Sequence, residues 1–197
     1  MSMSMPNQRS ANSLRGRAIG TMFFAFFGGF WFFIALYARQ QLNVASISTV
    51  LLGMLVLGLA AYKLMRLSDQ FPRVPEDPTI GRKFGLINLI QWGSIAVLVP
   101  TLGKLHLDVY VPTAITLIVG LHMLPLARLF RYPQHNITGC ALIVWAGAAM
   151  LIAPADSMQS TTCIGTGSIL WLSGAVTLIR AYRGAHQPKY SAFETVS

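Results

Sequence analysis

Three polar side chains stand out because they fall inside long apolar stretches of the sequence. The stretch "GLINLIQWG" (85–93) carries Asn88 and Gln91, and "GLHMLPLARLFRYP" (120–133) carries His122. Residues at i and i+3 share one face of a helix, so the two amides are expected to project together. Amides donate and accept hydrogen bonds, and an imidazole can also exchange a proton near neutral pH. Such a cluster could bind a small ligand or pass a proton.

Pro125 follows His122 at a distance of three residues and alters its surroundings. A proline inside a helix cannot donate to the carbonyl four residues earlier, which here belongs to Leu121. The sequence therefore predicts a free carbonyl acceptor and a kink beside His122.

The three polar residues are expected to lie at one depth. Taking Lys83 and Arg128 as the ends of the two apolar stretches, the rise of a helix places Asn88 and Gln91 roughly 8 and 12 Å inward and His122 roughly 9 Å inward. Because only a short loop joins the two stretches, we expect them to be neighbouring helices. An amide and imidazole cluster between them is the predicted site.

Two functions remain open for this cluster. In the first, the side chains hydrogen-bond across helices and fix their packing, which contributes about 0.6 kcal/mol per contact in membrane proteins. In the second, they line a half-buried pocket, open to the cytoplasm, that binds a small molecule or carries a proton. The first is favoured because three amide or imidazole groups are few for a substrate site.

The distribution of the other reactive residues argues against catalysis. The acidic residues all lie outside the apolar stretches: Asp69, Glu76, Asp77, Asp108, Asp156 and Glu194. A proton-coupled antiporter of the carboxylate type is therefore disfavoured. The histidines are dispersed over different segments, and Ser168 in "GTGSILWLSG" (165–174) has no histidine after it in the membrane. We expect no catalytic residue, no metal ion, no cofactor and no enzymatic activity.

Six apolar segments must position the cluster. Only 11% of the 197 residues are charged, against roughly 25% in soluble domains. A helix of about 20 apolar residues crosses the hydrocarbon core of a bilayer. We therefore predict an all-α integral membrane protein whose transmembrane domain covers 18–182, between tails 1–17 and 183–197. Its transmembrane helices are predicted at 18–38, 42–64, 84–103, 109–129, 134–154 and 158–181.

Basic residues set the orientation of these spans. Thirteen of the 15 Lys and Arg residues fall on one side of the predicted membrane, and only Arg39 and Lys104 fall on the other. Cytoplasmic segments carry the excess of Lys and Arg, so both termini are predicted to be cytoplasmic. The basic residues form short clusters between spans, which favours membrane lipids and not nucleic acid as the partner.

A short basic pattern recurs where the even-numbered spans end. It reads "KLMR" at 63–66, "RLFR" at 128–131 and "RAYR" at 180–183. Three tandem helical hairpins inserted in the same sense would produce this pattern. The enrichment of basic residues at cytoplasmic span ends would produce it too, so both explanations stay open.

The stretches "GRKFGLINLIQWG" (81–93) and "GLHMLPLARLFRYP" (120–133) give the chain a family resemblance. It resembles a family of small, uncharacterised six-span bacterial membrane proteins, which implies a multi-pass protein of the bacterial inner membrane. A weaker similarity is to acid-resistance membrane proteins built from three hairpins. We expect a non-catalytic membrane protein, with a small-molecule transporter or ligand-binding protein as the alternative. Assembly into a homo-oligomer and the identity of any small-molecule ligand stay open.

Overall fold

The computed structural model describes residues 11–71 and 78–186, which fold into six long helices and one short 3-10 turn. The elements are α1 (Ala11–Ala38), α2 (Val44–Ser68), α3 (Pro78–Lys104), η1 (Asp108–Tyr110), α4 (Val111–Leu129), α5 (Gln134–Ile152) and α6 (Met158–His186). The described residues contain no strand, and six helices are long and apolar enough to cross a membrane. The prediction of an all-α protein with six spans is confirmed.

Several helices are longer than the apolar stretches that predicted them. Helix α1 begins at Ala11 and so includes basic residues that the sequence placed in a tail, and α6 continues to His186. Helix α3 begins at Pro78, six residues before the predicted span. Proline suits the first turn of a helix because the amide it lacks would have no partner there. The helices therefore extend past the apolar stretches of the sequence, because backbone hydrogen bonding continues where apolar composition stops.

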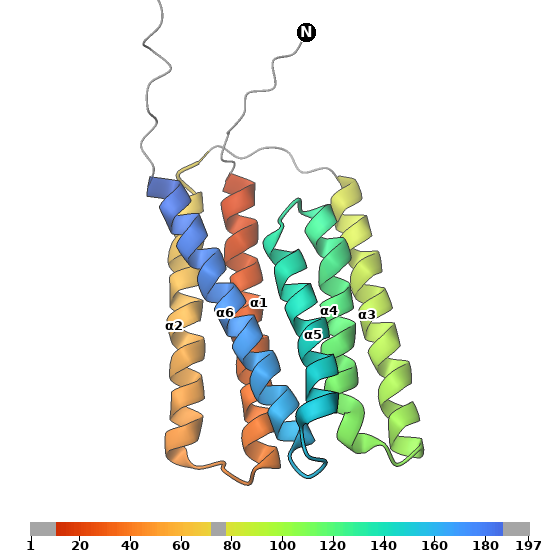
Figure 1. Ribbon diagram of the computed structural model, residues 1–197. Helices are drawn as coiled ribbons and strands as arrows, with labels where there is room; N and C mark the ends of the chain where they lie inside the picture. Colours follow the sequence, from red (N-terminus) through yellow and green to blue (C-terminus); the bar gives the residue numbers. More distant parts are fainter. Residues whose placement is uncertain (1–10, 72–77, 187–197) are drawn as a thin grey trace, which may run out of the picture.

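The helices run alternately up and down, with α1, α2 and α6 on one side of the bundle and α3, α4 and α5 on the other (Figure 1). The pairs α1–α2, α3–α4 and α5–α6 pack as hairpins, as the tandem-hairpin hypothesis expects, but α1 packs even more extensively on α6, and α4 packs more extensively on α5 than on α3. The hairpins are therefore not separate units. Helix α3 lies at the edge, contacts only α4 and η1, and has no buried residue.

One end of the bundle, here called the basic end, is where α1, α3 and α5 begin and where α2, α4 and α6 end (Figure 1). The basic side chains at this end within the described residues are Arg15, Arg17, Lys63, Arg66, Arg82, Lys83, Arg128, Arg131, Arg180 and Arg183. Arg39 and Lys104 lie at the opposite end. The grouping of charges inferred from chain order thus corresponds to one physical end of the fold.

Left-handed residues close three of the helices. Gln40, His106 and Arg131 have φ of 54°, 56° and 50°, and they follow the ends of α1, α3 and α4. A residue in this conformation turns the chain so that the last carbonyls of the helix are still bonded. After α4, for example, the Tyr132 amide donates to the Ala127 carbonyl at 3.0 Å. These turns make the connections between spans short.

Glycines allow a close approach of the backbones at two helix crossings. A Cβ atom placed on Gly167 of α6 would lie 2.9 Å from the carbonyl oxygen of Gly28 on α1, and one placed on Gly139 of α5 would lie 2.7 Å from that of Gly120 on α4. Such distances leave no room for a side chain, so the backbones are in contact. Small residues allow this approach, which strengthens dispersion contacts where lipid supplies no hydrophobic driving force.

Two tryptophans fill the space beside these crossings. Trp171 of α6 donates its indole N–H to the Ala25 carbonyl of α1 at 3.0 Å and lies against Gly28 and Gly53. Trp145 of α5 donates to the Thr162 carbonyl of α6 at 3.1 Å. A large ring against a glycine gives close packing, and the hydrogen bond satisfies the indole N–H in an apolar region. Packing therefore accounts for both side chains.

Candidate functional site

The predicted amide and imidazole cluster lies where α3 meets α4. His122 of α4 lies close to the backbone of Ile87 on α3, one residue before Asn88. The Asn88 amide donates to the Phe84 carbonyl of its own helix at 2.9 Å, and Gln91 is half-buried. No hydrogen bond joins the Asn88, Gln91 and His122 side chains within the described residues. The helices that carry them are neighbours, but the bonds that would make the three side chains one polar unit are not formed.

Pro125 lies inside α4, which continues through it to Leu129. The proline is exposed, and the chain leaves the helix four residues later. Leu121, whose carbonyl was predicted to be free, therefore lies in the same unbroken helix, directly before His122.

His135, at the start of α5, is a second imidazole that the sequence did not connect to this region. Its ring makes edge contacts with Tyr132 at 5.3 Å, Phe24 of α1 at 6.1 Å and Phe130 at 6.4 Å between centroids. His135 is near enough to His122 for the two imidazoles to interact electrostatically. The Nδ1 atoms of both rings are buried and have no hydrogen-bond partner among the residues that the structure describes. The two imidazoles are therefore neighbours, here called the imidazole pair, and the aromatic rings contact His135.

Tyr132 and Gln134 connect this pair to the basic end. The Arg17 guanidinium lies over the Tyr132 ring, 5.0 Å from its centroid, and the Tyr132 hydroxyl donates to Thr177 of α6 at 3.3 Å. Gln134 is buried, and its side-chain oxygen accepts from Arg180 of α6 at 2.8 Å. Each bond joins α1 or α6 to the α4–α5 turn. The two sides of the bundle are thus tied together by polar contacts at this end.

A set of hydroxyl pairs continues these ties through the membrane-spanning part of α6. Thr162 pairs with Thr113 of α4 at 3.1 Å and Thr166 pairs with Thr116 at 2.8 Å. Further along, Ser173 accepts from Thr138 of α5 at 2.8 Å. All six side chains are buried. These pairs are the main polar feature of the interior, and the sequence analysis did not identify them.

The spacing on α6 could have revealed this set. Thr162, Thr166, Ser173 and Thr177 follow one another at intervals of four, seven and four residues, which places them on one helix face. A hydroxyl can donate to a carbonyl one turn earlier, as Thr166 does to Thr162 at 2.8 Å. Its hydrogen bond is then made within its own helix. The sequence alone does not show whether such a hydroxyl bonds within its own helix or to a neighbouring helix, so it does not predict the interhelical pairs.

The other candidates do not assemble a reactive site. Ser168 and His122 are not hydrogen-bonded to each other in the described part of the chain, and the neighbouring Gly165 and Gly167 serve close packing against Trp145 and α1. The described residues also contain no group of three or more His, Cys, Asp or Glu side chains that could hold a metal ion. Cys140 is exposed and Cys163 is buried, and both are free thiols.

Comparison with models of known protein families, with curated proteins and with solved structures found no match. The functional inference therefore depends on the geometry of this chain.

Proposed function

We propose that the chain is a non-catalytic integral protein of the bacterial inner membrane, with both termini in the cytoplasm and an interior closed by its own hydrogen bonds. The observation that carries this proposal is the set of buried hydroxyl pairs between α6 and its neighbours, Thr113 with Thr162, Thr116 with Thr166 and Thr138 with Ser173. A substrate path needs polar groups free to meet a ligand. Here six buried hydroxyl groups of the interior bind each other, which favours a structural role.

The orientation is supported by the asymmetry of charge between the two ends. In the described residues the basic end holds ten Lys and Arg side chains, whereas the opposite end holds Arg39 and Lys104. Lys and Arg near span ends are retained on the cytoplasmic side during insertion. The basic end is therefore assigned to the cytoplasm.

Reporter fusions test this topology. A fusion after Ser197 should be fluorescent with green fluorescent protein and inactive with alkaline phosphatase, because only the first works in the cytoplasm. A fusion in the loop after Lys104 should give the reverse pattern. A fusion after Gln70 serves as the matched control and should behave like the one after Ser197. If the Lys104 and Ser197 fusions reported the same side, the number of spans would be wrong.

A second candidate function is small-molecule binding or transport at the paired imidazoles. It is favoured by one observation, the two buried Nδ1 atoms of His122 and His135 that lack partners, since a buried acceptor without a partner costs free energy. In this candidate the site is formed by the imidazoles of α4 and α5 and not by the amides of α3. It requires that solvent or ligand reach His122 from the basic end, whereas the structural role requires that this position be closed.

A further inference from the structure

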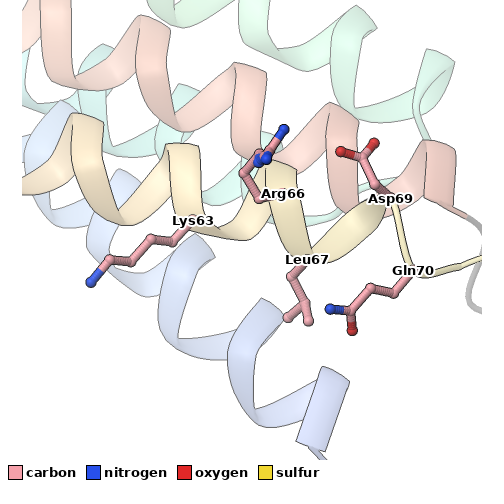
Figure 2. A pocket seen from close by; sticks show the side chains of 5 residues that line it. All are labelled: Lys63, Arg66, Leu67, Asp69 and Gln70. Carbon is pink, nitrogen blue, oxygen red and sulfur yellow. The ribbon is translucent and has the colours of Figure 1, made fainter.

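A surface cavity lies on the last turns of α2, at the basic end and away from the imidazole pair. Its volume is about 530 Å³, and its lining residues are Lys63, Arg66, Leu67, Asp69 and Gln70. Figure 2 shows their side chains, which come from the last turns of α2 and from the two residues that follow it, beside the end of α6. The cavity thus combines cationic, amide and aliphatic groups at the level where a span leaves the membrane.

The inner side of the cavity is fixed by contacts between α2 and α6. The Tyr182 hydroxyl of α6 donates to the Ala60 carbonyl of α2 at 2.8 Å, one turn before Lys63. Leu67 packs against a buried cluster that includes Leu64 and Ala181. A tyrosine at a span end is typical of the zone between acyl chains and headgroups. The apolar floor is therefore rigid, and the charged groups stand at headgroup level.

The charges favour an anion. Lys63 and Arg66 are exposed and supply two positive charges, and Gln70 adds an amide donor. Asp69 opposes them with one negative charge, and it has an interaction of its own within the chain. The carbonyls at the end of α2 carry a partial negative charge that holds cations nearby, so an anion must be bound by the side chains. Arg pairs with phosphate oxygens through two N–H groups, and Lys acts as a point charge.

We propose that this cavity binds the phosphate of an anionic phospholipid, with the start of an acyl chain against Leu67. The proposal rests on the assignment of the basic end to the anionic cytoplasmic leaflet. It goes beyond a general attraction to the surface because it places the phosphate at Lys63 and Arg66. Free phosphate offers the same oxygens without the acyl chain, so it distinguishes a lipid site from an anion site.

The test compares binding by the full chain in nanodiscs. The double variant Lys63→Gln/Arg66→Gln is matched with Arg82→Gln/Lys83→Gln, which removes the same charge from the same end on α3. The first variant loses both cationic side chains that would contact the phosphate, so it should lose roughly tenfold or more in affinity for phosphatidylglycerol. The control should change less than twofold. Phosphatidylcholine and inorganic phosphate should bind the unmodified chain at least tenfold more weakly.

Three results would overturn the proposal. Equal losses in both double variants would show attraction to the whole basic end. Phosphatidylcholine binding as tight as phosphatidylglycerol would remove the role of charge, and inorganic phosphate binding as tight would indicate a free anion site. If the double variant does not fold, Lys63→Glu is tested in its place. It changes one exposed side chain and should abolish the preference for phosphatidylglycerol. Nanodiscs expose both faces of the bilayer, so lipid binding can be measured whichever way the chain is oriented. A negative binding result is therefore independent of the result of the topology test.

Discussion

Replacing Gly139 with alanine is expected to destabilise the bundle by about 1–3 kcal/mol, which is typical when a packed interior is overfilled. The new Cβ would lie 2.7 Å from the carbonyl oxygen of Gly120 and 3.0 Å from the Cβ of Met123. The first contact is with backbone, so α4 and α5 must move apart. The free energy of unfolding in detergent, followed by tryptophan fluorescence, measures the effect.

Gly147→Ala is the matched control because it changes the same helix where no atom lies within 4 Å of the new Cβ. It should be neutral or stabilise by up to about 1 kcal/mol, since alanine favours helix more than glycine does. Adding Gly120→Ala to Gly139→Ala should give no rescue, because its Cβ would meet the Gly139 carbonyl at 3.0 Å. Equal stability of the Gly139→Ala and Gly147→Ala variants would contradict a backbone contact between α4 and α5.

Replacing Gly28 with alanine is expected to destabilise the α1–α6 crossing by a similar amount, about 1–3 kcal/mol, for a different reason. Here the new Cβ would overlap the indole of Trp171, which is held by its bond to Ala25 and enclosed by Gly53 of α2. The nearest obstacle is a side chain and can be removed, whereas the Gly167 carbonyl oxygen, 3.2 Å from the new Cβ, remains. In a Trp171→Ala background, the cost of Gly28→Ala should fall below half its original value.

The same unfolding measurement completes this double-mutant cycle, with Gly20→Ala of α1 as the control because nothing lies within 4 Å of its Cβ. Trp171→Ala alone should cost about 3–5 kcal/mol, as expected for the loss of a large, closely packed ring. Additive effects of Gly28→Ala and Trp171→Ala would mean that the two residues do not share this contact.

The sequence predicted the parts of the fold that depend on local composition. Apolar length located all six spans, and the short turn around His106 correctly made α3 and α4 neighbours. Basic residues grouped the helix ends correctly because insertion acts on each loop separately. The helix limits at Ala11, Pro78 and His186 were not predicted, because backbone hydrogen bonding continues where apolar composition stops.

The arrangement around the imidazoles could not be predicted in the same way. Lipid and protein interior are both apolar, so the pattern of Leu, Ile and Phe does not show which face of a span is buried. The approach of Phe24 to His135, and of α1 to α6 at Gly28 and Gly167, depends on residues far apart in the chain. For that reason Asn88 and Gln91 stood out in the sequence, whereas His135 and the hydroxyl pairs of α6 did not.

The most direct test of a closed interior is solvent access at His122. In a background with Cys140→Ala and Cys163→Ala, His122→Cys should resist a membrane-impermeant maleimide applied to the side of the membrane that carries the basic end. Gln70→Cys, on an exposed residue at that end, should react fully under the same conditions. A closed, non-catalytic bundle predicts labelling of His122→Cys at less than a tenth of the Gln70→Cys rate. Labelling at equal rates would contradict it and indicate an open path to the imidazole pair.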